Sequence, residues 1–182
     1  MDAELEACPM VNQTLPIKAY HSAAATFHAP SDLSGIRGMH RERIRAMPRW
    51  QNGPGRYDCV FFEKNPEVDR FKGLHVACVK LFISFVIDGI TYPCALVDWF
   101  SQYGVSPCED TGLWRVQPDF DGAGRRVCSI IHIDTILRAA HLIGVAGAQI
   151  LPRDFTHHDA LDSFRLFYVN KFADHHAHEI AR

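Results

Sequence analysis

Apolar and β-branched residues dominate the middle of the chain, from Tyr57 to Ile133. Runs of this composition that are bounded by Gly, Pro, Asn and Asp are typical of strands. Asp88-Gly89 joins the two longest runs, and this dipeptide is a strong signal for a tight hairpin turn. The pattern therefore predicts strands at Tyr57–Phe62, Leu74–Ile87, Ile90–Phe100, Leu113–Val116 and Val127–Ile133.

Two helices are predicted after these strands, each with a capping residue at its start. The first spans Ile136–Ile143, with Asp134 or Thr135 as its cap and Gly144 at its end. The second begins near His157, and its apolar residues recur at helical spacings. Its cap and its apolar face are Thr156, Leu161, Phe164, Phe167, Tyr168 and Phe172. Strands followed by helices indicate an α+β fold, with a small antiparallel sheet or partly open barrel followed by two helices.

These elements divide the chain into an irregular N-terminal arm, residues 1–36, and a single α+β domain, residues 37–182. The domain consists of a basic arm at 37–56, a β-rich core at 57–133 and a helical C-terminal part at 134–182. The N-terminal arm shows no sustained periodicity and contains three prolines, which favour irregular structure. For the basic arm, a short helix and an extended conformation both fit the sequence.

The composition is that of an ordinary globular protein, with 47% hydrophobic and 22% charged residues. The longest apolar run, Val76–Ile90, contains Lys80 and Asp88 and is shorter than a membrane-spanning helix. The acidic N-terminus lacks a signal segment, so we expect an intracellular protein. The six cysteines form no Cys-x-x-Cys pair, and those within apolar runs are expected to be reduced core residues. No cofactor is predicted.

Basic charge is concentrated in residues 37–56, which hold six arginines and one glutamate, although the whole chain has a net charge of −2. Guanidinium groups pair with phosphate oxygens, and a neighbouring aromatic ring can stack on a base. One interpretation is a site for nucleic acid or another acidic partner. The other is a solvated arm that balances the acidic remainder of the chain. The candidate residues are Arg37, Arg41, Arg43, Arg45, Arg49 and Trp50, with His40 nearby.

Two groups of residues raise the question of a metal site. His132 and Asp134, with one distant histidine, match the two-histidine, one-carboxylate set of non-haem iron enzymes. That histidine would be His175, His176 or His178. The alternative role for Asp134 is to cap the following helix. If residues 174–179 are helical, His175 and Glu179 share one face, as do Asp174 and His178. Such a face can hold zinc or can consist of exposed polar residues.

Several aromatic residues in the β-rich core have two interpretations. On a small barrel, aromatic rings can form a cage for methylated lysine through cation–π contacts. Large aromatic residues at strand ends more often supply buried core area. The residues concerned are Tyr92, Trp99, Phe100, Tyr103 and Trp114. The sequence contains no nucleophile elbow, phosphate loop or dinucleotide fingerprint.

Most of the chain, residues 40–181, resembles the C-terminal region of open reading frames in mushroom-forming fungi. Those frames belong to, or lie beside, mobile elements of the Kyakuja–Dileera–Zisupton transposase group. The segments that carry the resemblance are RERIRAMPRWQNGPGRYDCVFFE (41–63), FISFVIDGITYPCALVDWF (82–100), EDTGLWRVQPDF (109–120), IIHIDTILRAAHLI (130–143) and FYVNKFADHHAHEIA (167–181).

The resemblance implies an accessory region of a transposon-derived protein that acts in the nucleus, on or near DNA. A transposase of this group would have a larger RNase H-like catalytic core, and no segment here resembles that core. Asp98, Asp110 and Asp134 are therefore not assigned to it. The order of strands followed by a helix also resembles bromo-adjacent-homology and SH3-like barrels, which bind chromatin; this is an analogy of fold alone.

The leading hypothesis is a non-enzymatic module that binds DNA or chromatin through residues 37–50. A second hypothesis is a metal-dependent enzyme of the non-haem iron kind that uses His132, Asp134 and a C-terminal histidine. A third is a protein-interaction module that binds a partner, or a second copy of the chain, through a helix over Tyr168–Phe172. No membrane association is predicted under any of the three.

Overall fold

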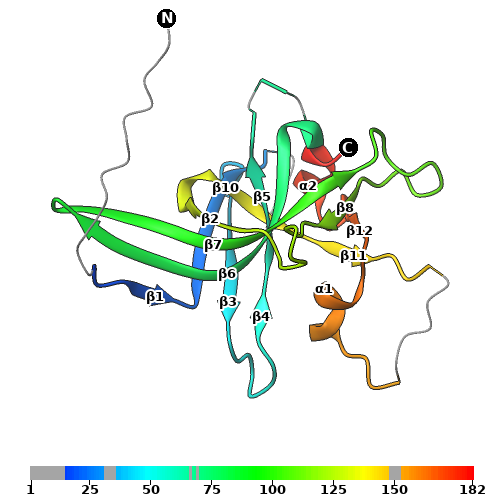
Figure 1. Ribbon diagram of the computed structural model, residues 1–182. Helices are drawn as coiled ribbons and strands as arrows, with labels where there is room; N and C mark the ends of the chain where they lie inside the picture. The colour runs from blue at the N-terminus through cyan, green and yellow to red at the C-terminus, as the bar shows by residue number, and fades with distance from the viewer. Residues whose placement is uncertain (1–14, 31–35, 66, 69, 148–152) are drawn as a thin grey trace, which may run out of the picture.

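The structure is a computed structural model that describes residues 15–30, 36–65, 67–68, 70–147 and 153–182. In these residues the strands form two antiparallel sheets (Figure 1). The larger sheet contains β1 (Lys18–Tyr20), β5 (Cys59–Glu63), β6 (Leu74–Ile87), β7 (Ile90–Tyr103), β8 (Arg115–Pro118), β9 (Cys128–His132), β10 (Ile136–Ala140), β11 (Leu142–Gly144) and β12 (Phe167–Val169). The smaller sheet contains β2 (Ser22–His28), β3 (Met39–Met47) and β4 (Arg56–Tyr57).

The hairpin of β6 and β7 is the longest feature of the larger sheet, and Figure 1 shows its tip extending away from the other elements. Asp88 and Gly89 have φ angles of 50° and 78°, the two positive values that a type I′ turn requires. Ile87 pairs directly with Ile90 across this turn. The hairpin predicted from Asp88-Gly89 is therefore confirmed.

The larger sheet curls into a nearly closed barrel. Along its main path the strands follow the order β10-β5-β6-β7-β8-β12-β11, so β10 and β11 lie at opposite ends of that path. In the chain these two strands are separated by His141 alone, which brings the two ends of the sheet together. Antiparallel sheets close in this way to remove exposed edges. The predicted class, a small antiparallel sheet or partly open barrel with two short α-helices, is confirmed in the described residues.

Two apolar cores lie on the two faces of the β5–β6–β7 part of the sheet. The first, inside the barrel, contains Phe61, Phe71, Phe100, Trp114 and Phe167 among its buried residues. The second, between the barrel and the small sheet, contains Ile44, Ala46, Val60, Val79, Phe82 and Val97. Residues of β6 alternate between the two cores, as the two-residue period of a strand requires.

A β-bulge at Lys80 changes that alternation. The register of β6 against β7 shifts between Val79 and Leu81, so Lys80 is the additional residue. Before the bulge, Cys78 belongs to the core inside the barrel and Val79 to the core outside it. Beyond the bulge, Phe82 packs in the outer core, although an uninterrupted two-residue period would place it with Cys78.

The helix predicted at Ile136–Ile143 is wrong, because this stretch forms β10 and β11. β10 pairs with β5 and β11 with β12, so these residues close the barrel. A short apolar run fits both a helix and a strand, and here the unpaired edges of the sheet decide the outcome. The predicted cap role of Asp134 is also wrong. It lies in a 3-10 turn, η2 (Ile133–Thr135), whose N-cap is His132.

The second predicted helix is broken into several elements. Thr156 does begin a helical turn, since its backbone N–H donates to Asp159 Oδ2 at 3.1 Å in a capping box. The turn consists of η3 (His157–Asp159) and α1 (Ala160–Ser163) and then stops. β12 follows, and a last helix, α2, spans His175–Ile180. The helix over Tyr168–Phe172 that self-association was predicted to use therefore does not form.

The predicted irregular arm differs from the structure, and the basic arm adopts one of its two predicted conformations. Within residues 1–36, β1 and β2 are strands, while residues 1–14 lie outside the described residues. Residues 37–56 form β3, a turn and the start of β4, so the extended one of the two predicted conformations is observed, paired within a sheet. The reason is the alternation in β3, where Ile44 and Ala46 are buried and the residues between them are more exposed.

Candidate functional site

Three of the predicted arginines lie on one face of β3. Arg41, Arg43 and Arg45 alternate with inward-facing residues, so their side chains lie on the outer face of the small sheet. Successive members are roughly 6.6 Å apart, because a strand rises about 3.3 Å per residue. We call these three residues the arginine ladder. On the neighbouring strand β2 they pair with Thr26, Ala24 and Ser22.

The arginine ladder keeps its positive charge available. Arg43 Nη1 donates to Ser22 Oγ at 3.3 Å, and Arg45 Nη1 donates to the Arg43 carbonyl at 3.4 Å. Within the described part of the chain, none of the three guanidinium groups forms an ion pair with a carboxylate. Glu42 points to the opposite side of the strand and lies 3.5 Å from Arg138 Nη2. Exposed cations without carboxylate partners are suited to an external anion.

Trp50 lies at one end of the arginine ladder. The guanidinium of Arg45 lies 4.8 Å from the centre of the Trp50 ring, and that of Arg56 lies 5.4 Å from it. Trp50 belongs to the tight turn between β3 and β4, where its backbone N–H donates to the Pro54 carbonyl at 3.0 Å. Positive φ angles at Gln51 and Asn52, 50° and 62°, close that turn. The turn therefore fixes the ring beside two cations.

The other two predicted residues do not join this row. Arg37 is exposed and has a φ of 55° in the turn before β3, at the opposite end of the strand from Trp50. Arg49 is exposed in the segment between β3 and Trp50. The structure thus brings together four of the six predicted residues, Arg41, Arg43, Arg45 and Trp50.

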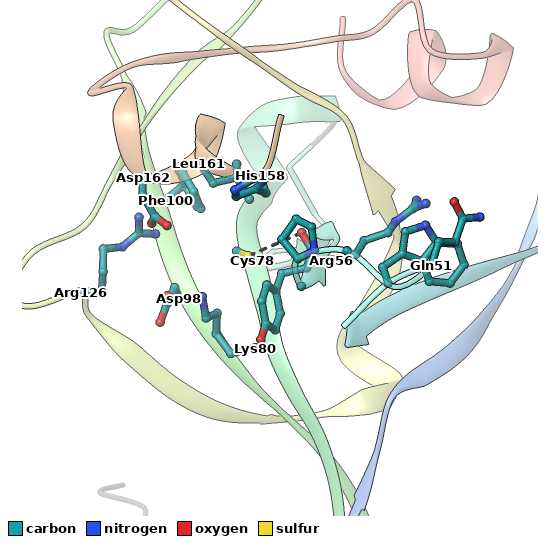
Figure 2. Close-up of a pocket in the computed structure, with 15 residues that line it drawn as sticks. Gln51, Arg56, Cys78, Lys80, Asp98, Phe100, Arg126, His158, Leu161 and Asp162 are labelled. Carbon is teal, nitrogen blue, oxygen red and sulfur yellow. Dashed lines mark hydrogen bonds and ion pairs between the residues drawn. The ribbon is translucent and has the colours of Figure 1, made fainter. Parts of the chain in front are cut away.

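A cleft of about 470 Å³ opens beside Trp50, at one end of the barrel. It lies between the β3–β4 turn, the β6–β7 hairpin and the η3–α1 segment (Figure 2). In this view Arg126 and Asp162 lie on one side, Arg56 lies on the other, and Lys80 and Asp98 come from the hairpin between them. Aromatic and apolar lining is contributed by Trp50, Tyr57, Phe100 and Leu161.

Charged groups of the cleft lie close to its rings. Lys80 Nζ is 3.9 Å from Asp98 Oδ2 and 4.6 Å from the centre of the Tyr57 ring. The guanidinium of Arg126 lies 4.6 Å from the centre of the Phe100 ring, and its Nη2 donates to the Trp99 carbonyl at 3.2 Å. Its Nε is buried without a hydrogen-bond partner among the described residues. Sequence reasoning missed this cleft because its residues come from separate segments.

The residues considered for a metal site do not converge. His132 Nδ1 accepts a hydrogen bond from the Asp134 N–H at 3.3 Å and lies 3.5 Å from Asp134 Oδ2. His175 Nδ1 lies 3.6 Å from Glu179 Oε1 on the predicted shared face of α2. Over the described ranges, no group of three or more His, Cys, Asp or Glu side chains has the arrangement of a metal site.

Asp174 and His176, which were also considered for a metal site, belong to an ionic network around the buried Arg138. Arg138, which is 4% exposed, donates from Nη1 and Nη2 to the two carboxylate oxygens of Asp174 at 2.8 and 2.5 Å. These hydrogen bonds lower the pKa of Asp174. Burial raises the pKa of Glu42, which accepts from the Ala139 N–H, and burial lowers the pKa of His176. The network connects α2 with β3 and β10.

The aromatic residues considered for a cage are dispersed. Phe100 and Trp114 are buried in the core inside the barrel, and Trp99 packs against the outer core. Tyr92 stacks on Phe85, with ring centres 5.6 Å apart. Tyr103 is exposed and lies near Arg115. The core role applies to Phe100, Trp114 and Trp99, and the five rings enclose no common space.

The cysteines differ in their surroundings. Cys59, Cys78 and Cys94 are buried free thiols, as predicted, whereas Cys128 is exposed and Cys8 lies outside the described residues. Cys108 is also buried, and its pKa is lowered to about 7 by hydrogen bonds from Thr111 and then from Tyr168. Among the described residues no helix is long and apolar enough to cross a membrane.

Comparison with known proteins adds no relative to this picture. No protein-family model matches the chain, and neither the curated proteins nor the solved structures contain a significant match. The likeness to bromo-adjacent-homology and SH3-like barrels and the resemblance to fungal mobile-element reading frames stay predictions.

Proposed function

We propose that this protein is a non-enzymatic module that binds nucleic acid through the arginine ladder and Trp50. The observation that carries the proposal is the row of three strand-spaced guanidinium groups without carboxylate partners in the described residues, ending at an aromatic ring. Arginine forks pair with phosphate oxygens, and an adjacent ring adds a stacking surface. The local row matters more than the chain's net charge of −2, since surface charge acts over short distances at physiological salt.

The resemblance to mobile-element reading frames supports the same proposal from a second direction. An accessory module of such a protein would act on DNA or chromatin in the nucleus, and a row of arginines provides contacts that do not depend on base sequence. We therefore propose contacts mainly to the phosphate backbone. Affinity should then depend strongly on salt and little on sequence.

Fluorescence anisotropy with labelled DNA at 50 and 200 mM salt tests the proposal. If three phosphates are neutralised on a single strand, the observed affinity falls about 20-fold between these concentrations. Replacement of all three ladder arginines by alanine should abolish the salt-sensitive binding. The matched control removes three exposed positive charges elsewhere, by alanine substitution of Lys72, Arg125 and Arg165. The proposal is wrong if the wild-type chain does not bind at low salt, or if the ladder and control variants bind equally.

A further inference from the structure

The cleft and the arginine ladder form one continuous surface. Trp50 contacts Arg45 of the ladder and also lines the cleft. Arg56 lies beside the same ring, lines the cleft, and pairs across the sheet with Met47, which follows Arg45 by two residues on β3. A strand of nucleic acid that follows the ladder towards Trp50 therefore reaches the mouth of the cleft.

The walls of the cleft combine flat rings with cations. Trp50 and Tyr57 each have a positive group at 4.6 to 5.4 Å from the ring centre, whereas Phe100 is 1% exposed and belongs to the barrel core. Rings stack on planar heterocycles whatever their sequence, and cations beside them bind an attached phosphate. A ligand that is both planar and anionic satisfies both features, whereas a purely apolar ligand would offer the cations no hydrogen-bond acceptor.

The polar groups of the cleft also suit a nucleobase. Asp98 and Asp162 supply carboxylate oxygens, which accept hydrogen bonds from the amino groups and ring N–H groups of bases. Three cations, Arg56, Lys80 and Arg126, line the cleft together with these two carboxylates. Arg56 Nε lies 2.8 Å from Asp58 Oδ1 and Lys80 Nζ lies 3.9 Å from Asp98 Oδ2, whereas no carboxylate pairs with Arg126 in the described residues. The Nε of Arg126 is a buried donor that still lacks an acceptor among the described residues. Lys80, the additional residue of the bulge, adds its ammonium group to the lining.

The size of the cleft restricts the ligand further. A volume of about 470 Å³ lies near the lower end of the range for small-molecule sites, which is roughly 300–1,000 Å³. This is enough for one nucleotide. A base can enter such a cleft only if it is unpaired and unstacked, as bases in single strands are.

We infer that the cleft binds one unpaired nucleotide of the strand that lies on the arginine ladder, with the base against its rings and the phosphate near Arg56 and Lys80. This inference rests on the proposed function and narrows it to single-stranded nucleic acid. A free nucleoside monophosphate has the same chemistry, so the experiment must distinguish the two sources.

The test uses the full chain and a single strand of about 12 nucleotides, within the usual site sizes, with one 2-aminopurine base. Quenching of 2-aminopurine fluorescence reports the stacked base, and anisotropy reports the affinity of the strand. Asp162→Met places a longer side chain without a ring in the cleft from an exposed position on α1. Asp154→Met makes the same chemical change at an exposed position outside the cleft. Lys80→Gln removes one cation and leaves the cleft open.

We expect Asp162→Met to lose the quenching and to weaken single-strand binding about tenfold, because one base loses its stacking partners. Lys80→Gln should weaken binding several-fold, and Asp154→Met should bind as the wild type does. A duplex of the same sequence should bind the wild type at least several-fold more weakly than the single strand.

Three results would overturn the inference, and the first leaves the proposed function standing. If binding needs the ladder but Asp162→Met binds and quenches as the wild type does, or if duplex binds equally well, the inference fails and the proposed function stands. If adenosine monophosphate alone quenches tryptophan fluorescence in the wild type but not in Asp162→Met, while no strand binds, the ligand is a free nucleotide and both fail. If neither ligand binds at low salt, both fail.

Discussion

Removal of the Asp174 charge should destabilise the fold, because Asp174 is the main partner of a buried guanidinium. Arg138 is 4% exposed and donates two short hydrogen bonds to Asp174, whereas Glu42 Oε2 lies farther away, at 3.5 Å. Loss of one partner of a fully buried ion pair costs about 3–5 kcal/mol. The Asp174 side chain is 37% exposed, so solvent screening reduces this, and we expect about 2 kcal/mol for Asp174→Asn.

The choice of asparagine separates the ion pair from helix capping. Asp174 is also the N-cap of α2, where it accepts a hydrogen bond from the Ala177 N–H at 2.8 Å. Asparagine preserves this cap, whereas Asp174→Ala removes it at a further cost of about 1 kcal/mol. In a chain of this size 1 kcal/mol shifts the unfolding midpoint by about 2–4 °C. Asp174→Asn should therefore lower the midpoint by about 4–8 °C, and Asp174→Ala by a few degrees more.

Thermal unfolding followed by circular dichroism at pH 7 measures these shifts. Asp162→Asn, which changes an exposed carboxylate in the same way, should stay within about 0.5 kcal/mol of the wild type. The pKa of Asp174 is lowered in the folded state from 3.8, so its contribution is complete above that value and disappears as the pH falls through the folded-state pKa. The reasoning is refuted if Asp174→Asn is as stable as Asp162→Asn at pH 7, or if the difference from the wild type does not become smaller as the pH is lowered below 3.8.

Three further predictions concern separate sites. Burial lowers the pKa of His176 from 6.5, so as the pH falls the imidazole is protonated in the unfolded chain before it is protonated in the folded protein. The free energy of unfolding should therefore decline as the pH falls below 6.5. Urea titrations at pH 7.0 and 5.5 should show a smaller decline for His176→Gln than for the wild type. Gly144→Ala should cost about 1–3 kcal/mol, since the added Cβ would lie 2.2 Å from Phe164 Cδ2, whereas Gly122→Ala, with no atom within 4 Å, should change the unfolding midpoint little. The thiolate absorbance of Cys108 should titrate with a midpoint near pH 7. Thr111→Val should raise this midpoint, because the hydrogen bond from the Thr111 side chain contributes most to the lowered pKa of Cys108. An unchanged midpoint would contradict this assignment.

The central hairpin could be predicted from the sequence because its signals are local. Long β-branched runs on both sides of Asp88-Gly89 specify two strands and the turn between them, and the observed pairing of Ile87 with Ile90 follows. The segment that forms β3 carries a comparable local signal. Ile44 and Ala46 alternate with arginines at a period of two, which is a strand pattern rather than a helical one.

The C-terminal part could not be predicted in the same way. The residues of β10 and β11 form a short apolar stretch that carries no clear period, so local propensity allows a helix. The outcome depends on distant edges, since β10 completes the sheet beside β5 and β11 completes it beside β12. Arg138 in β10 is also buried against Asp174, an arrangement that a sequence pattern does not indicate.

Part of the candidate site lies within one sequence segment, and the rest comes from segments that are far apart in the sequence. The arginines of the ladder are alternate residues of one short segment, so the sequence shows that they cluster, but their common face depends on β3 being a strand. The cleft depends on Lys80, Asp98 and Arg126, which come from β6, β7 and the segment before β9. Only the folded barrel brings these three side chains together.

The bulge at Lys80 explains why strand alternation alone would give a wrong description of the site. In an uninterrupted strand, Cys78, Lys80 and Phe82 would all face the inside of the barrel. The additional residue lets Phe82 turn to the outer core, where it pairs with Ala95, while Lys80 stays on the side of Cys78 and lines the cleft. A charged residue can occupy this strand because it lies where one regular alternation ends and the next begins. The irregularity that allows both cores to pack therefore lies at the residue that lines the cleft and whose ammonium group is 4.6 Å from the centre of the Tyr57 ring.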